Sequence, residues 1–131
     1  MQELDSPRMK KTLPRYLTLE ESLALLDAVQ GKNKERDYCI LMLFLNCGLR
    51  ISELVNLNVS DIQGDTIRVL GKGNKERILY LNDGCKAALE SYLTVRAMLS
   101  LQHEPALFVS NRRTRITRAG IHKMVKKYLL T

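Results

Sequence analysis

Apolar residues recur at helical spacing over most of the chain and predict four longer helices and a short one. Leu19, Leu23 and Leu26 fall on one face of a helix expected at about 18–30. Thr18 and Glu21 have the spacing of a capping box, which marks the start of this helix. A second helix is expected from about 34 to the glycine at 48, and its stretch 38–45 is apolar on every side. That pattern is typical of a helix enclosed by others.

Two further helices follow in the second half of the chain. One begins at Asn82 or Asp83, continues to about 99, and is expected to bury Cys85, Leu89, Tyr92 and Leu93. The last begins after Thr117, with an apolar stripe that ends at Tyr128. The stripe consists of Ile121, Met124, Val125 and Tyr128.

Between these helices the period of the pattern changes from helical to alternating. Residues 66–70 and 77–80 read as two short strands joined across Gly71–Glu76, with Ile67 and Val69 alternating in the first and Ile78 and Tyr80 in the second. A short helix is expected at about 50–56 and a short strand at 106–109. The predicted fold class is α+β and mainly helical: a helical cluster with a small antiparallel β-hairpin or sheet at one edge.

The start of the sequence indicates the domain organisation, and the cysteines indicate the cellular compartment. Residues 1–17 show no periodicity and contain two prolines, so we expect a linker, followed by one domain over 18–131. No apolar stretch approaches the roughly 18 residues needed to span a bilayer, and no signal peptide opens the chain. Cys39 and Cys47 lie in an apolar helix, which indicates buried, reduced thiols. We therefore expect a soluble, cytoplasmic protein with no bound metal.

The positive charge is concentrated in the second half. Residues 1–65 hold 8 Lys/Arg against 10 Asp/Glu, whereas residues 66–131 hold 13 against 4. Seven cations and no acid lie between Arg112 and Lys127. Such a one-sided distribution favours a polyanionic partner, most simply a nucleic acid, over a basic face that is merely solvated.

Two cations stand out by position. Arg50 follows an apolar run and is expected to be enclosed, so its guanidinium needs either a phosphate or a carboxylate such as Glu53 or Asp37. Lys72 lies between two glycines at the expected hairpin tip, where an ordinary exposed turn lysine is the alternative. Together, a fixed arginine and a lysine on a mobile hairpin suit a site that binds a phosphodiester and protonates a leaving oxygen.

The order of two motifs resembles the tyrosine recombinase, or phage integrase, family, notably its Xer-like and transposon integrase members. The motifs are Gly48-Leu49-Arg50-Ile51-Ser52-Glu53-Leu54 and Gly71-Lys72-Gly73-Asn74-Lys75-Glu76-Arg77. The resemblance covers about 14–131 and implies the N-terminal part of a catalytic domain, with 1–17 as a remnant of an interdomain linker. It also implies strand exchange through a covalent 3′-phosphotyrosine without metal or cofactor, in a phage or other mobile element or in an Xer-like system.

The resemblance assigns roles to individual residues. Arg50 matches the catalytic arginine that stabilises the scissile phosphate, and Lys72 matches the hairpin lysine that acts as a general acid. Glu53 matches a supporting position beside the arginine. The last helix resembles a helix that enters the major groove. The expected contacts with double-stranded DNA are Asn74, Lys75, Arg77, Arg118, His122, Lys123 and Lys126.

Other parts of the family pattern do not follow in this sequence. Neither His103 nor His122 begins a His-x-x-Arg segment, and Tyr128 falls on an apolar stripe, so it is expected in the core. We therefore expect this chain to be the DNA-binding part of a site-specific recombinase. By itself, the chain is expected to be inactive as an enzyme. The alternatives are a non-catalytic module that occupies recombination sites and a structural piece whose exposed apolar edge drives self-association.

Overall fold

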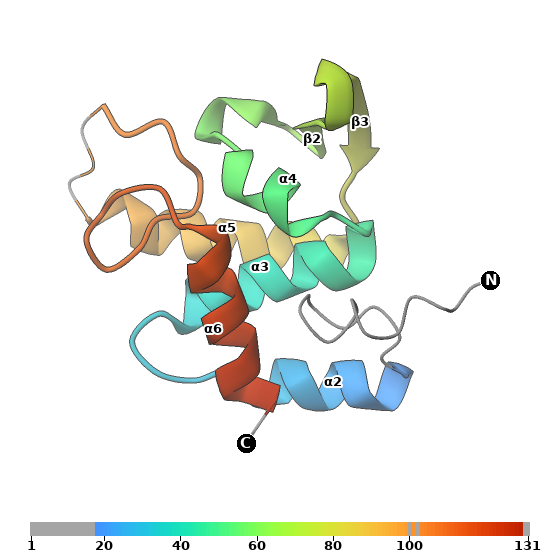
Figure 1. The fold of residues 1–131 in the computed structure, drawn as a ribbon, viewed down its shortest axis with the longest axis vertical. Helices are drawn as coiled ribbons and strands as arrows, with labels where there is room; N and C mark the ends of the chain where they lie inside the picture. Colours follow the sequence, from blue (N-terminus) through green and yellow to red (C-terminus); the bar gives the residue numbers. More distant parts are fainter. Residues whose placement is uncertain (1–17, 100, 102, 130–131) are drawn as a thin grey trace.

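The protein is a cluster of helices around α3, with a small sheet at one edge. The computed structural model describes residues 18–129 except 100 and 102. Figure 1 shows α5 behind α3, α2 alongside it, and α6 crossing toward α2, while α4 and the hairpin lie at the opposite edge. The helices are α2 (Leu19–Asp27), α3 (Lys34–Cys47), α4 (Ile51–Asn56), α5 (Asp83–Ala97) and α6 (Arg118–Leu129), with 3-10 turns η1 (Val59–Asp61) and η2 (Lys72–Asn74).

This arrangement confirms the predicted α+β, mainly helical fold class. The linker expected at 1–17 lies outside the described residues. None of the helices within the described part of the chain has both the length and the apolar character needed to cross a membrane.

The helix boundaries follow local chemistry that the sequence displays. Thr18 and Glu21 form the expected capping box, with Oγ1 of Thr18 3.0 Å from the Glu21 amide nitrogen. Gly48 ends α3 with a φ of 66°, a left-handed conformation that glycine adopts without strain. Asn82 caps α5 by accepting a hydrogen bond from the Cys85 amide. Thr117 accepts one from the Gly120 amide at the start of α6.

The predicted apolar face of the last helix is confirmed, whereas that of the first is right for Leu26 and wrong for Leu19 and Leu23. All four stripe residues of α6 are buried. In α2, by contrast, Leu19 and Leu23 are 77% and 53% exposed, and Leu25 is the residue that enters the core. Leucines occupy 19, 23, 25 and 26, so helical spacing alone allows two faces. Packing against α3 selects the face that carries Leu25 and Leu26.

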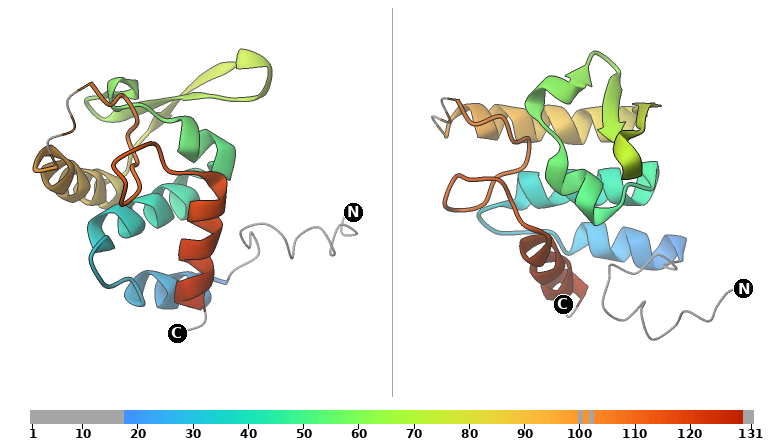
Figure 2. Two further views of the ribbon diagram at one scale, coloured as in Figure 1. Left: turned by 60° about the vertical axis from the view of Figure 1, so that its left-hand side comes forward. Right: turned by 45° about the horizontal axis from the view of Figure 1, so that its top comes forward.

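The sheet has three antiparallel strands in the order β1-β2-β3, one more than predicted. They are β1 (Ile62–Gln63), β2 (Thr66–Leu70) and β3 (Glu76–Tyr80). Ile67 pairs with Leu79 and Val69 with Arg77 across β2 and β3, and Ile67 and Val69 are buried in the core. Ile78 and Tyr80 are on the outer face, 51% and 82% exposed. Figure 2 shows the hairpin of β2 and β3 projecting from the helical cluster.

The strand expected at 106–109 does not form. Its two ends make isolated bridges instead, Ala106 with Asn58 and Val109 with Arg115. All four residues are nevertheless buried, because the segment passes over α5, where the Tyr92 hydroxyl donates a 2.7 Å hydrogen bond to the Leu107 carbonyl. Its apolar sequence therefore reflects burial and not pairing in a sheet.

Candidate functional site

Arg50 and Lys72 lie at the rim of one surface hollow of about 350 Å³, although they are 22 positions apart in the sequence. Arg50 immediately precedes α4, and Lys72 begins the η2 turn at the tip of the hairpin. Ser52, Glu53, Asn56, Leu70 and Gly71 complete the lining. We call this feature the Arg50–Lys72 hollow.

The prediction that Arg50 is enclosed is wrong. Leu49 is buried, but the next residue turns outward as the N-cap of α4, so Arg50 is exposed. Neither suggested carboxylate pairs with its guanidinium: Glu53 pairs with Arg77, and Asp37 pairs with Arg36. Lys72 is exposed, as expected for a hairpin tip. Within the described residues, neither the Arg50 guanidinium nor the Lys72 ammonium makes a hydrogen bond or an ion pair.

Glu53 forms the buried floor of this site and is only 7% exposed. Its Oε1 accepts a 2.8 Å hydrogen bond from the Arg50 amide, and its two oxygens accept from the Arg77 guanidinium at 2.7 and 3.2 Å. These bonds from Arg77 lower the pKa of Glu53, although burial acts in the opposite direction. Glu53 and Arg77 balance each other's charge, and the charge of Arg50 also lowers the pKa of Glu53 to a smaller extent. Arg50 and Lys72 are thus two cations at the hollow without an ion pair to any carboxylate of the described residues.

The loop that carries Lys72 is tightly closed. The Gly71 amide donates to the Lys75 carbonyl at 2.8 Å, and the Asn74 amide donates to the Gly71 carbonyl at 3.1 Å. Gly73 and Asn74 both have left-handed backbones, with φ of 71° and 60°. Such a turn favours glycine and asparagine, and this explains the Gly-Asn sequence beside the lysine.

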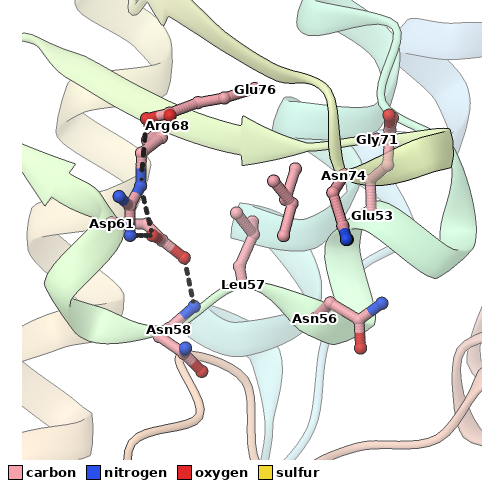
Figure 3. Close-up of a pocket in the computed structure, with 10 residues that line it drawn as sticks. Glu53, Asn56, Leu57, Asn58, Asp61, Arg68, Gly71, Asn74 and Glu76 are labelled. Atoms are coloured by element: carbon pink, nitrogen blue, oxygen red, sulfur yellow. Dashed lines mark hydrogen bonds and ion pairs between the residues drawn. The ribbon is translucent and has the colours of Figure 1, made fainter.

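A second hollow, of about 300 Å³, adjoins the first and shares Glu53, Asn56, Leu70 and Gly71 with it. Figure 3 shows its opposite wall, where the Arg68 guanidinium donates to Asp61 Oδ1 at 2.9 and 3.1 Å. Asp61 also accepts from the Asn58 amide. Asn74, from the hairpin loop, and Asn56, from α4, carry amide side chains at this hollow.

The predicted DNA-contacting residues divide between two places. Asn74, Lys75 and Arg77 are exposed on the hairpin near the Arg50–Lys72 hollow, with Arg77 engaged on Glu53. Arg118, Lys123 and Lys126 are exposed on α6, and His122 is half-buried there. Lys123 and Lys126 lie on the side opposite the buried stripe, with Arg118 and His122 at its edge, and we call these four residues the basic face of α6.

Two further arginines of the basic half have structural roles that the sequence did not reveal. Arg115 donates to the carbonyls of Val55 and Leu57 at 2.7 and 3.1 Å, and also to the Asn58 side chain. Arg96 donates to the carbonyls of Glu104, Ala106 and Leu107. Their backbone partners are carbonyls at the end of α4 and in the irregular segments that contain Leu57 and 104–107, and no sequence pattern identifies such acceptors in advance.

Tyr128 lies in the core, as predicted. It is 3% exposed, and its hydroxyl is 2.6 Å from Asp37 Oδ2 and 3.0 Å from the Gln30 carbonyl oxygen. Burial is the main cause that raises the pKa of Tyr128 to about 12. Cys39 and Cys85 are buried and Cys47 is half-buried, and all three thiols are free. Cys47 is therefore less enclosed than expected.

Comparison with known proteins agrees with this arrangement. The sequence model of the phage integrase family matches residues 15–131. The chain is 52% identical over 128 residues to tyrosine recombinase XerC of Caldanaerobacter subterraneus subsp. tengcongensis, which covers 98% of this chain and 36% of that protein. It is 37% identical over 130 residues to tyrosine recombinase XerD of Halalkalibacterium halodurans, covering 95% of this chain and 44% of the relative.

Solved structures show the same fold. The crystal structure of XerA recombinase superimposes with a TM-score of 0.79 and 35% identity over 90% of this chain and 42% of that one. The XerH site-specific recombinase bound to its difH substrate superimposes with a TM-score of 0.72 and 23% identity, over 91% and 37% of the respective chains. The present chain thus spans less than half the length of each of these four proteins.

Proposed function

The chain belongs to the phage integrase family of tyrosine recombinases, and from this premise we propose that it is the DNA-binding first part of a recombinase catalytic domain. The observation that carries the proposal is the meeting of Arg50 and Lys72 at one hollow with no carboxylate of the described residues left to neutralise them. A DNA phosphate would supply the missing negative charge. Residues 18–131 form this part of the domain, and 1–17 act as a linker to a preceding one.

The chemistry of the two cations suits opposite sides of a phosphodiester. The planar guanidinium of an arginine matches two phosphate oxygens, so Arg50 stabilises the negative charge on the non-bridging oxygens of the phosphate. Lys72 carries a transferable proton at the end of a long side chain, so it protonates the departing 5′-oxygen. Glu53 supports both residues without touching the substrate.

The basic face of α6 supplies a second contact with the same duplex. In this proposal His122, Lys123 and Lys126 contact phosphates, and Arg118, the first residue of α6, lies nearest the base edges. Asn74 and Lys75 reach the backbone beside Lys72. Support comes from the relatives' structures, because XerH was solved with its difH substrate and lambda integrase with a COC′ core site.

By itself, the chain binds DNA without cutting it. Each of its tyrosines would need access to the hollow, and Tyr128, the last in the sequence, is held in the core against Asp37. Self-association of protomers on DNA is part of the proposal, since lambda integrase was solved as a tetramer on a Holliday junction. The exposed Leu19 and Leu23 of α2 offer an apolar surface for it. The protein acts on DNA in the cytoplasm.

Two measurements test the proposal. Fluorescence anisotropy with a labelled duplex of about 30 base pairs should show salt-dependent binding that weakens when Arg50 or Lys72 is changed to alanine. Denaturing electrophoresis of the same mixtures should show no protein–DNA adduct. A covalent adduct would overturn the inactivity of the chain, and binding that ignores both substitutions would leave a DNA-binding module with no recombinase site.

A further inference from the structure

Arg77 makes contacts that differ from those expected of a DNA-binding cation. The structure assigns Arg77 a positioning role: its bidentate contact with Glu53 holds the hairpin loop, and therefore Lys72, in a fixed position relative to Arg50. This positioning role is a property of the folded chain itself. It rests on the proposed function only for the effect that it would have on DNA binding.

One carboxylate touches both parts of the site. Glu53 Oε1 lies 2.8 Å from the Arg50 amide nitrogen and 3.2 Å from Arg77 Nη2, while Oε2 lies 2.7 Å from Nη1. The residue that precedes α4 and the second residue of β3 are therefore joined through a single side chain. Because Glu53 is buried, water cannot readily replace either partner.

The root of the hairpin loop rests on this pair. A Cβ atom added at Gly71 would lie 3.2 Å from Glu53 Oε2 and 3.5 Å from Arg77 Nη1. The Gly71 backbone thus packs directly against the contact between Arg77 and Glu53, and Lys72 is the residue that follows Gly71 in the sequence. Since the loop is closed by the bond from the Gly71 amide to the Lys75 carbonyl, displacement of its root moves the lysine with it.

Arg77 uses two of the five N–H donors of its guanidinium on Glu53 and could offer a DNA phosphate only the remaining ones while that contact is kept. Its side chain is 44% exposed, yet both terminal nitrogens already donate to Glu53. Moving the guanidinium to a DNA phosphate would leave a buried carboxylate without its cation, which is strongly unfavourable. Lysine at this position would keep the charge but could not span both oxygens.

The same hairpin carries a matched control. Arg68, on β2, donates through two nitrogens to one oxygen of Asp61 and also pairs with Glu76 at 3.5 Å, and Asp61 accepts a backbone amide bond from Asn58. Changing Arg68 to methionine removes the same charge as Arg77→Met and breaks ion pairs in the same hairpin. Within the described residues no hydrogen bond joins Asp61 to Arg50, so the Arg50 amide and the hairpin loop should not respond to Arg68→Met.

The experiment measures amide hydrogen exchange and 15N relaxation in the isotopically labelled chain for the wild type, Arg77→Met, Arg77→Lys and Arg68→Met. Arg77→Met should make the Arg50 amide exchange about tenfold faster, because a hydrogen bond to a charged group contributes at least that factor to local opening. It should also increase the mobility of residues 71–75. Arg77→Lys should give an intermediate result, and Arg68→Met should leave both regions as in the wild type. Melting temperatures of the two methionine variants separate this local effect from general destabilisation.

Equal changes in Arg77→Met and Arg68→Met, or an Arg50 amide and loop unaffected by Arg77→Met, would overturn the positioning role. A second arm adds duplex DNA: in the wild type Arg50 and Lys72 resonances should shift together, and in Arg77→Met the Lys72 shift should be lost while those of α6 persist. A wild-type chain that fails to bind DNA would refute the proposed function, whereas the exchange result in the free chain would still decide the role of Arg77.

Discussion

The Tyr128 hydroxyl lies 2.6 Å from Asp37 Oδ2 and so joins the end of α6 to the start of α3 across 91 positions of sequence. Arg36 pairs with the other oxygen of Asp37 at 2.9 Å and donates to the Val109 carbonyl as well. The last tyrosine of the chain is thus one member of a buried polar network and has no access to the Arg50–Lys72 hollow.

Replacing Tyr128 by phenylalanine should therefore weaken the fold and leave DNA binding intact. The free energy of unfolding should fall by about 1–3 kcal/mol, the typical cost of leaving a buried charged group with one partner fewer. Urea unfolding measures the change, and duplex anisotropy serves as the control. Unchanged stability together with abolished DNA binding would place Tyr128 at the DNA and contradict its core role.

Stability should decline in alkaline solution because two tyrosines are held protonated. Burial raises the pKa of Tyr92 and that of Tyr128 to about 12, above the value of about 10 in an unfolded chain. The contribution is complete below about pH 10 and disappears as the pH rises through about 12. Urea midpoints at about pH 8 and about pH 11 should differ less in a Tyr92→Phe/Tyr128→Phe variant than in the wild type. If the midpoints at the two pH values differ equally in the variant and in the wild type, the two tyrosines do not cause the alkaline loss of stability.

Arg115 should act on stability rather than on DNA affinity. It supports the end of α4 by donating to the carbonyls of Val55 and Leu57. Changing it to methionine should lower the unfolding free energy by about 2–3 kcal/mol, since several charge-assisted hydrogen bonds disappear together. Under conditions where the variant is folded, its DNA affinity should fall no further than that of Lys86→Ala, which changes a lysine on α5 that pairs with Asp65 and Asp83. A larger fall in affinity at unchanged stability would instead place Arg115 at the DNA.

The basic face of α6 should contribute affinity through phosphates. Changing Lys123 and Lys126 to alanine should reduce the slope of log K against log salt concentration by about 0.9 for each phosphate that is no longer neutralised. Lys86→Ala is the matched control, because Lys86 lies on α5 and pairs with Asp65 and Asp83. A control that lowers the slope as much as an α6 substitution would show a diffuse charge effect instead of an interface.

The two glycines flanking Lys72 should respond differently to alanine. Gly73 has a φ of 71° with open space around it, so Gly73→Ala should cost about 1 kcal/mol of backbone strain without disturbing Glu53. Gly71 has an ordinary backbone but packs on Glu53, so Gly71→Ala should shift the Arg50 amide resonance even if stability changes little. A two-dimensional 15N spectrum of each variant measures this difference, and the reverse pattern would refute the close approach at Gly71.

The two cations could be located from the sequence because both lie in motifs whose neighbours form local structure. Glycines at 71 and 73 predict a turn, and the alternation of Ile67 and Val69 predicts the strand before it, so the position of Lys72 follows from nearby residues. The helices and their caps are predictable for the same reason, since a cap depends on residues three positions apart.

Contacts between distant segments could not be predicted in this way. Glu53 binds Arg77 across 24 positions, and Arg115 reaches Val55 across 60, so neither partner is visible in a local pattern. The exposure of Arg50 escapes prediction for a related reason. An apolar run on one side indicates that Leu49 is buried, but the direction of the following residue depends on where α4 begins.

Binding of one DNA phosphate by both Arg50 and Lys72 is the statement on which the proposed function depends. A titration of the 15N-labelled chain with a short duplex tests it, following the Arg50 side-chain Nε and the Lys72 amide alongside residues of α6. Both signals should shift and saturate at one DNA concentration, and Arg50→Ala should abolish the shift at Lys72 while the α6 signals still respond. Shifts confined to α6 in the wild type, with Arg50 and Lys72 unchanged, would contradict shared binding of the phosphate.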